Sequence, residues 1–369
     1  MIGRTLKSLW FAVMAVALAA CDGGTGGTGA TSGSGATGVS YGAITGFGSV
    51  FVNGVEFSTS GATITIDDMP HSESDLRAGM VVTVRGSISG ATGTASQIKV
   101  DYAVKGFVEQ VTDANHMVVM GQIVLIDDQT NFESGVVPAF GDFASVYGYV
   151  TGDGVIAASF VEKEVAPPPF AVKGLVNNHI TGAPTFQVGA LTVNYNGAMI
   201  SDMPNGSWNG LLVEVKGDTC TGIAPAACGT LMATKVEPSG LTMTDATEAQ
   251  VEGFVTSFTS SSSFKIGSQA VVTNGSTVFE GGLASDIAPG VKLEAEGVLS
   301  AGVLTAGKIS FRDNIRLEAD VASLGADSSL TLSGLPGITV TVNSLTEFKG
   351  GITGFSGVAI GDHLQIRAG

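Results

Sequence analysis

The stretch Val50-Phe51-Val52-Asn53-Gly54-Val55-Glu56-Phe57 decides the fold of this chain. Two runs rich in β-branched and aromatic residues flank Asn53-Gly54, the pair that accepts positive φ at both central positions of a type I′ turn. The stretch therefore predicts a two-stranded hairpin. Nearly everything after residue 40 repeats, with variation, the unit to which this hairpin belongs.

A strand of the form apolar-x-Gly-x-apolar opens each of these units. Its central residues are Gly42, Gly106, Gly174, Gly253 and, with a change of residue type, Ala319. Because these positions are 64, 68, 79 and 66 residues apart, we predict five repeats of similar length. We place repeat 1 at residues 41–103, repeat 2 at 104–168, repeat 3 at 169–247, repeat 4 at 248–314 and an incomplete repeat 5 at 315–369.

Two further landmarks keep their order inside the repeats. Three repeats contain Thr-x-Phe-x-x-Gly, which begins at Thr130, Thr277 and Thr346. Repeat 5 stops where its closing hairpin should begin, which predicts either a native chain that continues past Gly369 or a strand supplied from elsewhere. Each of the first four repeats has two glycines seven positions apart around an alternating strand, namely Gly79 and Gly86, Gly141 and Gly148, Gly210 and Gly217, and Gly290 and Gly297.

The composition and the short repeats predict an all-β fold. The chain has 53 glycines and lacks long stretches with helical periodicity. About five to six strands per repeat are too few for a two-sheet sandwich, but they can close into a small barrel without exposed edges. We therefore predict tandem OB-like barrels. Five such units in line, each about 28 Å across, would form a rod on the order of 140 Å long.

These landmarks resemble Domain of Unknown Function 5666, a family found in tandem in bacterial envelope lipoproteins. The opening strands, the Thr-x-Phe-x-x-Gly segments and the paired glycines carry the resemblance, which covers roughly residues 41–369. Repeat 1 departs from the pattern, because Met69-Pro70-His71 stands where other repeats have Thr-x-Phe. The resemblance implies a small β-barrel and a location in the cell envelope, and it implies no activity.

The N-terminus predicts a lipoprotein signal peptide over residues 1–20. Arg4 and Lys7 precede an apolar run that is too short for a permanent membrane span. Leu18-Ala19-Ala20-Cys21 then resembles the bacterial lipobox, which implies cleavage before Cys21 and lipid attachment to this residue. An ordinary signal peptide, or an uncleaved anchor with a chance cysteine, is the alternative.

The residues after the leader bear on where the protein acts. Residues 21–40 are rich in Gly, Ser and Thr and predict a flexible tether. Asp22 resembles the residue that keeps enteric lipoproteins in the inner membrane, so we expect an anchored envelope protein that faces the periplasm or the surface, with a lean toward the inner membrane. The formal net charge of −16 becomes −18 without Arg4 and Lys7. Such an acidic protein repels phosphate backbones, so we expect no nucleic-acid partner.

Cysteine spacing predicts one disulfide. With Cys21 taken by lipid, Cys220 and Cys228 remain, both within the longest repeat. Their spacing suits a bond that closes a hairpin loop in an oxidising compartment. A metal site at this pair would need further ligands, which the neighbouring sequence lacks.

The sequence shows no catalytic constellation. The four histidines, one to a repeat at unmatched positions, are expected to be ordinary surface or loop residues; they are His71, His116, His179 and His363. Asp67-Asp68 and Asp127-Asp128 fall at corresponding turns and could offer carboxylates to Ca²⁺. A calcium loop needs more oxygen ligands, however, and aspartate is a common turn residue. We therefore expect a protein that is not an enzyme and holds no cofactor or metal.

Two functions fit these observations. The first is a lipid-anchored, non-enzymatic repeat scaffold that engages another envelope protein. The second is an oligosaccharide or small-ligand module, because OB-like barrels often bind such ligands on one face. Trp208, the tryptophan outside the leader, is the candidate platform for a ligand. If Trp208 fills a core, its loss should unfold repeat 3, whereas the loss of a surface platform should leave stability unchanged.

Overall fold

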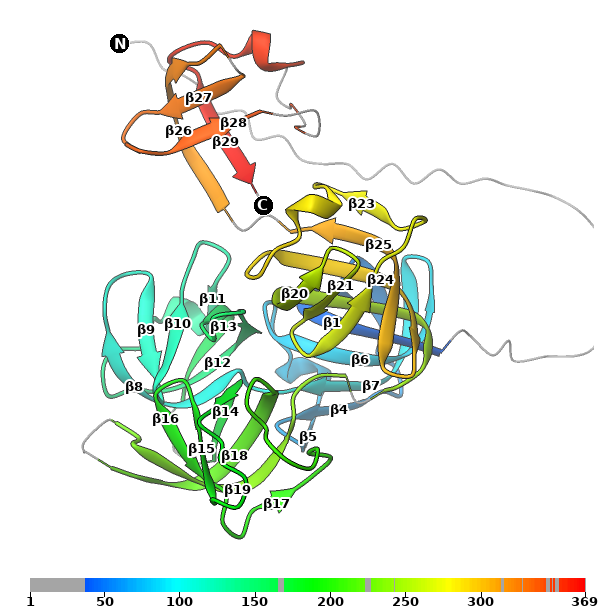
Figure 1. The fold of residues 1–369 in the computed structure, drawn as a ribbon, viewed down its shortest axis with the longest axis vertical. Coiled ribbons are helices and arrows are strands. Elements are labelled where there is room, and N and C mark those ends of the chain that lie inside the picture. Colours follow the sequence, from blue (N-terminus) through cyan, green and yellow to red (C-terminus); the bar gives the residue numbers. More distant parts are fainter. Residues whose placement is uncertain are drawn as a thin grey trace, which may run out of the picture. The chain divides into compact units, whose positions relative to one another are not determined.

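The computed structural model describes residues 37–164, 169–222, 227–241, 243–312, 315–326, 328–342, 346, 348 and 352–368. The described chain is all-β, and its helical segments are 3₁₀ turns of three residues (Figure 1). Within these ranges no helix is long and apolar enough to cross a membrane. The predicted all-β fold class is confirmed, whereas the predicted signal peptide and Cys21 lie outside the described residues.

Repeat 1 folds into a closed cycle of five hydrogen-bonded strands. β1 (Thr37–Gly46) pairs with β2 (Val50–Val52), β2 with β3 (Val55–Ser58), β3 with β7 (Thr92–Val100), β7 with β6 (Val81–Ser89), and β6 with β1. Only the contact of β3 with β7 is parallel within this cycle, as expected for an OB-like barrel. Between β3 and β6 come β4 (Thr63–Ile66), β5 (Met69–His71) and η1 (Glu73–Asp75).

Repeats 2, 3 and 4 close by the same cycle of pairings. In each, an opening strand is followed by a hairpin, a short strand and a closing hairpin of two long strands. Repeat 2 contains β8 (Val104–Val111), β9 (His116–Val119), β10 (Gln122–Leu125), β11 (Asn131–Phe132), η2 (Glu133–Gly135), β12 (Phe143–Val150) and β13 (Ile156–Glu164). Repeat 3 contains β14 (Phe170–Asn177), β15 (Thr185–Val188), β16 (Leu191–Asn194), β17 (Met199–Ile200), β18 (Leu212–Thr221) and β19 (Thr230–Pro238). Repeat 4 contains β20 (Ala246–Ser260), β21 (Ser263–Ile266), β22 (Gln269–Val272), β23 (Val278–Glu280), η3 (Ala284–Asp286), β24 (Lys292–Ser300) and β25 (Val303–Phe311).

The described strands of repeat 5 form a four-stranded sheet. β26 (Ile315–Leu324) pairs with β27 (Ser329–Leu332) and with β29 (His363–Ala368), and β27 pairs with β28 (Thr339–Thr341). The turn η4 (Phe355–Gly357) precedes β29. These elements correspond to the opening strand, the hairpin and the first strand of the closing hairpin in the other repeats.

The two spaced glycines of each closing hairpin have separate structural roles. The first lies in a tight turn with positive φ, as at Gly141 with φ 85°, and the second lies at a β-bulge. A Cβ on Gly148 would lie 2.1 Å from the carbonyl oxygen of Ala157, so only glycine fits at this crossing of two strands. The same bulge and close approach recur at Gly86, Gly217 and Gly297.

The hairpin at residues 50–57 forms as the sequence predicts. Asn53 and Gly54 adopt φ values of 50° and 76°, both positive as a type I′ turn requires. The marker glycine of the opening strand then makes room for this hairpin, because a Cβ on Gly42 would lie 2.3 Å from Asn53 Oδ1. In repeat 2 the corresponding Gly106 makes the same room for Met120.

The Thr-x-Phe-x-x-Gly landmark ties the middle of a repeat to its closing strand. The Thr130 hydroxyl donates to the carbonyl oxygen of Ala158 at 2.8 Å, and the Thr277 hydroxyl donates to that of Ala306 at 2.7 Å. The phenylalanines of the landmark pack, partly buried, against the cores of their repeats. The landmark therefore fixes the segment before the closing hairpin in repeats 2 and 4.

The barrels share sheets instead of following one another in line. β1 of repeat 1 pairs in parallel with β20 of repeat 4, from Gly38 opposite Glu248 to Tyr41 opposite Val251. β8 of repeat 2 pairs antiparallel with β14 of repeat 3, and these two repeats share one hydrophobic core. Repeats 1 and 4 are thus neighbours although two repeats separate them in the sequence. The prediction of five barrels in line is therefore wrong. The sequence could not show this arrangement, because pairing between the opening strands of distant repeats leaves no local signal.

Two repeats begin earlier than predicted. β1 starts at Thr37, inside the predicted tether, because residues 37–40 pair with β6. β20 starts at Ala246, two residues before the predicted start of repeat 4 at residue 248. Backbone pairing with a neighbouring strand, which composition does not reveal, sets both boundaries.

Candidate functional site

Lysine and aspartate side chains join repeat 1 to repeat 3. Asp67 and Asp68 form the turn between β4 and β5, where both have positive φ. The Lys216 Nζ of β18 lies 2.8 Å from Asp67 Oδ1 and 2.7 Å from Asp68 Oδ2, and the Lys235 Nζ of β19 lies 3.2 Å from Asp68 Oδ2. Lysines of another repeat therefore engage these two carboxylates.

More charges lie behind this contact, where burial is deeper. The Lys173 Nζ of β14 lies 3.7 Å from Glu214 Oε2 and 3.8 Å from Asp101 Oδ2, and the Lys99 Nζ lies 3.0 Å from the same oxygen of Asp101. Glu214 is only 3 % exposed. We call the whole set the charged junction: Asp67, Asp68, Lys99, Asp101, Lys173, Glu214, Lys216 and Lys235.

The charged junction shifts the pKa values of its acids in opposite directions. Burial raises the pKa of the Glu214 carboxyl, because the charged form loses water. Burial acts the same way on Asp101, but the charges of Lys173 and Lys99 outweigh it and lower the pKa of Asp101. Burial also opposes ionisation of Asp68, yet hydrogen bonding and charge from Lys216 hold the pKa of Asp68 well below its ordinary value.

Tyr149 of β12 joins repeat 2 to repeats 1 and 4. Its ring centroid lies 6.2 Å from that of Tyr41 and 6.4 Å from that of Phe254, in edge-to-face geometry, and the Lys292 Nζ lies 4.9 Å from the Tyr149 centroid. Such ring contacts contribute about 0.5–1.5 kcal/mol each. Tyr149 and the charged junction together specify which surfaces of the four barrels meet.

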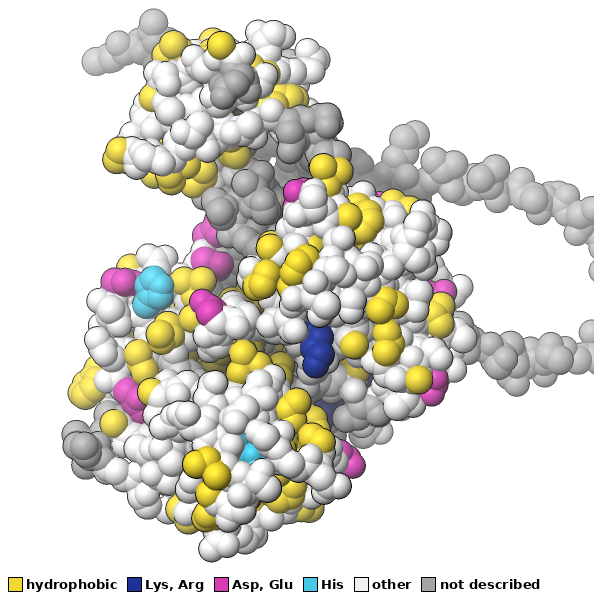
Figure 2. Space-filling view, viewed as in Figure 1, with side chains coloured by type: hydrophobic (Ala, Val, Ile, Leu, Met, Phe, Trp, Pro, Cys, Tyr) yellow, Lys and Arg dark blue, Asp and Glu magenta, His cyan; other side chains and the backbone are white. Residues whose placement is uncertain are grey.

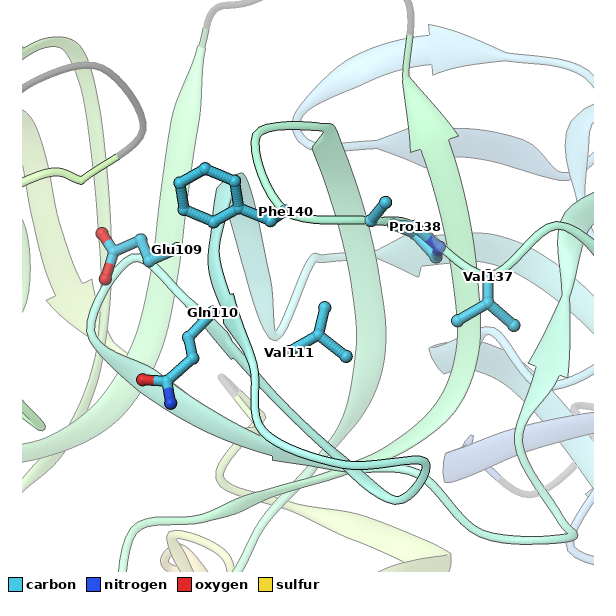
Figure 3. Close-up of a pocket in the computed structure, with 7 residues that line it drawn as sticks. Glu109, Gln110, Val111, Val137, Pro138 and Phe140 are labelled. Atoms are coloured by element: carbon cyan, nitrogen blue, oxygen red, sulfur yellow. The ribbon is translucent and has the colours of Figure 1, made fainter.

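An apolar groove opens on repeat 2 (Figure 3). It has a volume of about 710 Å³ and lies between the end of β8 and the loop that joins η2 to β12. We call it the repeat 2 groove, and its lining includes Glu109, Gln110, Val111, Val137, Pro138 and Phe140.

The repeat 2 groove exposes large apolar side chains. Val111 is 46 % exposed, Val137 55 % and Phe140 62 %, and the neighbouring Val136 is 46 % exposed. Figure 2 shows that uncharged polar groups and backbone cover most of the face in view, with separate apolar patches and few charged side chains. An exposed cluster of large apolar groups is informative, because a single exposed one is normal.

The repeat 2 groove adjoins the disulfide loop of repeat 3. Cys220 and Cys228 form the predicted disulfide, with their Cα atoms 5.3 Å apart. The backbone N–H of Cys228 donates to Glu109 Oε1 at 2.8 Å, and the N–H of Gly121 donates to Glu109 Oε2 at 2.9 Å. Glu109 thus belongs both to the groove and to the contact between repeats 2 and 3.

Trp208 lies in the core of repeat 3. Its side chain is 7 % exposed, its Nε1–H donates to the carbonyl oxygen of Pro204 at 2.9 Å, and its ring stacks on His179 with centroids 4.4 Å apart. His179 is in a loop, but it is 5 % exposed, and burial lowers the pKa of its imidazole. The Trp208 ring therefore presents no exposed face on which a sugar could stack.

The remaining histidines pair with nearby carboxylates. His71, His116 and His363 each have Nδ1 within 3.2 Å of an aspartate oxygen. In the part of the chain that the structure describes, no three His, Cys, Asp or Glu side chains form a group that could hold a metal ion.

Comparison with protein families agrees with this architecture. The family described as Domain of unknown function (DUF5666) matches residues 41–99, 105–162, 252–310 and 318–368, which is more than half of the chain. The chain belongs to this family. The four DUF5666 matches fall in repeats 1, 2, 4 and 5, and repeat 3 between them closes by the same strand cycle. No curated protein matches the chain, and the DUF5666 description assigns no activity.

Sequence reasoning missed both the charged junction and the repeat 2 groove. The Asp67-Asp68 turn was visible, but its partner Lys216 lies 148 residues further along the chain. A signal for the groove was readable in Val136-Val137-Pro138-Ala139-Phe140, an apolar run directly before the landmark glycine of repeat 2. Exposure of this run depends on what packs against it, which the run itself does not encode.

Proposed function

We propose that this protein is a non-enzymatic scaffold of the bacterial cell envelope, anchored by lipid at Cys21, whose barrels present the repeat 2 groove to a protein partner. The observation that carries the proposal is the joint exposure of Val111, Val137 and Phe140 around one groove. Burial of apolar surface favours association, and the surplus over the cost of ordering the interface appears as affinity. Contiguous apolar patches on soluble surfaces commonly mark interaction sites.

The charged junction supports a scaffold because its groups are occupied with one another. Lys216 and Lys173 lie among carboxylates of repeats 1 and 3. Removing one partner of a buried pair leaves an uncompensated charge, so such pairs favour one arrangement of the barrels over others. Barrels held in this way keep the repeat 2 groove in a constant position for a partner.

The proposed envelope location rests on the leader and the disulfide. The Cys220–Cys228 bond suits an oxidising compartment such as the periplasm. Several acyl chains on Cys21 would anchor the protein stably, whereas one chain binds a membrane only marginally. Replacing Cys21 with Ser should move the protein from the membrane fraction to the soluble fraction. Retention of the C21S variant in the membrane fraction would contradict the lipid anchor.

Crosslinking in the native envelope tests the scaffold. The full lipidated chain serves as bait, and the proteins recovered with it are compared with those of the double variant Val137→Asp, Phe140→Asp. The matched control is Ile180→Asp, because Ile180 of repeat 3 is 70 % exposed and lies outside the groove. A protein lost with the groove variant but kept with the control supports the proposal.

Ligand binding by an OB-like barrel face is the competing outcome. Recovery of only lipid or cell-wall glycan, with no protein enriched over an unrelated lipoprotein, would overturn the scaffold and favour an oligosaccharide module. The buried position of Trp208 means that such a module would have to use another surface.

A further inference from the structure

In repeat 1, the turn before the closing hairpin contacts another barrel, that of repeat 2. This turn contains Gly79, whose carbonyl oxygen accepts a hydrogen bond from the hydroxyl of Ser159 in β13. A Cβ on Gly79 would lie 2.4 Å from the carbonyl oxygen of Ser159, so the two backbones touch. Arg77 of the same turn forms an ion pair with Glu133 of repeat 2, with Nε and Oε2 3.4 Å apart. Repeat 1 thus holds the closing hairpin of repeat 2.

Repeat 4 holds the tip of that same hairpin with the corresponding surface. Gly152 lies in the turn between β12 and β13, and a Cβ on it would lie 2.9 Å from the carbonyl oxygen of Val255. The same Cβ would lie 3.7 Å from the backbone nitrogen of Gly290. Val255 follows the marker glycine of the opening strand, and Gly290 is the turn glycine of repeat 4. In repeat 4 the opening strand and the turn together receive the closing hairpin of another barrel.

Within the described residues, repeat 2 contacts a closing hairpin at the edge of its own surface of this kind. Glu109 follows the marker glycine Gly106 by three positions and binds the backbone of Cys228. Cys228 lies in the loop of the closing hairpin of repeat 3. This contact therefore again places the closing hairpin of one barrel against the opening strand of another. Beyond Glu109 the surface continues into the repeat 2 groove, where Val111 and Phe140 are exposed.

This surface is apolar in repeat 2 because the run Val136-Val137-Pro138-Ala139-Phe140 lies between η2 and the turn glycine Gly141. Pro138 is buried and stands three positions before its turn glycine. Leu76 and Ile287, at the same spacing, are also buried.

Val136 and Val137 come directly before this buried position. Both are among the exposed apolar side chains of repeat 2, at 46 % and 55 %. Burial of apolar surface drives association, so two exposed valines on a surface that elsewhere receives a barrel fit a docking role.

We propose that the repeat 2 groove binds the closing hairpin of a repeat in a second copy of this chain. This inference rests on the proposed function and names the partner. Contacts between barrels within the chain repeatedly place a closing hairpin against an opening strand and turn, and the groove continues one of these contacts. Because groove and hairpin are different surfaces, the contact between copies is heterologous, and it can link more than two chains.

The test uses two differently tagged copies of the full lipidated chain, expressed together. A photo-crosslinking phenylalanine analogue replaces Phe140, whose exposure of 62 % allows the change without loss of a core contact. We expect a crosslinked product that carries both tags. Adding Val137→Asp should lower the yield of this product about tenfold, which is the loss of affinity expected when a typical interface residue is changed. Adding Ile180→Asp should leave the yield unchanged.

The outcomes separate this inference from the proposed function. A product with both tags whose yield Val137→Asp lowers supports the second copy as the partner. A crosslink to a different envelope protein overturns the second copy but leaves the scaffold standing. Absence of any crosslink to protein, with an intact fold by circular dichroism, overturns both.

Discussion

The charged junction and the repeat 2 groove are both places where a barrel meets a neighbour, but their chemistry is opposite. The junction buries lysines and carboxylates that find their partners within the chain, as Lys216 does with Asp67. The groove exposes Val137 and Phe140, which keep more than half of their surface in contact with solvent. The comparison shows that contacts made once, during folding, can use charge for specificity, whereas an open docking surface offers apolar area.

Removal of Lys216 is expected to have the largest effect. Lys216→Ala leaves Asp67 and Glu214 without their common cation and should lower the free energy of unfolding by about 3–5 kcal/mol. Urea unfolding measures this loss. The control is Lys163→Ala, because the Lys163 side chain is 46 % exposed and its pair with Asp142 is worth about 1 kcal/mol or less. Equal losses in the two variants would show that the junction is no more than a surface pair.

Removal of the disulfide is expected to have an intermediate effect. The double variant Cys220→Ser, Cys228→Ser releases a loop closed over a sequence separation of 8 and should cost about 2.5 kcal/mol by the chain-entropy estimate. Thermal unfolding with and without reductant measures it. Because Cys228 binds Glu109, the variant should also weaken crosslinking at the groove. Unchanged crosslinking would separate the groove from the contact between repeats 2 and 3.

Acid should weaken the charged junction before it affects the groove. The pKa of Asp68 is lowered from its ordinary value of 3.8, and that of Asp101 is lowered as well, so the folded state binds fewer protons than the unfolded state. Their contribution to stability is full above the ordinary pKa and is lost as the pH falls through the folded values. Glu214 has the opposite effect on the pH dependence of stability. Burial raises the pKa of its carboxyl, so the folded state binds a proton more readily there than the unfolded state does.

Urea unfolding at a series of pH values below 5 checks this prediction. The variant Asp68→Asn should be less stable near neutral pH and should lose less stability on acidification than the parent chain. Parallel pH curves for the two proteins would mean that Asp68 does not carry the acid dependence.

Substitution in the groove should have the smallest effect on stability. Phe140→Asp should change the free energy of unfolding by less than about 0.5 kcal/mol, because Phe140 is 62 % exposed. The same change should nevertheless abolish partner capture. Trp208→Ala provides the contrast, since a buried aromatic side chain should cost about 3–5 kcal/mol. A destabilised Phe140→Asp variant would place this ring in the fold and remove it from the docking surface.

Local chemistry explains how much of the fold the sequence could predict. Asn53-Gly54 encodes its turn because few residues tolerate positive φ at both positions. Gly148 is required because a Cβ there would meet the neighbouring strand, so its seven-residue spacing from Gly141 was readable. The Cys220–Cys228 pair was predictable because both partners lie in one closing hairpin, at a sequence separation of 8.

The sequence by itself determined the repeats, the all-β class, the hairpins and the disulfide, because each follows from residues a few positions apart. Only the tertiary structure decided that β1 pairs with β20, that Lys216 meets Asp67 and that Phe140 lies in the open. These features depend on contacts between segments separated by a hundred residues or more, or on what packs over a loop. Strand pairing and ion pairing at such separations depend on complementary surfaces, and no periodicity in the sequence records them.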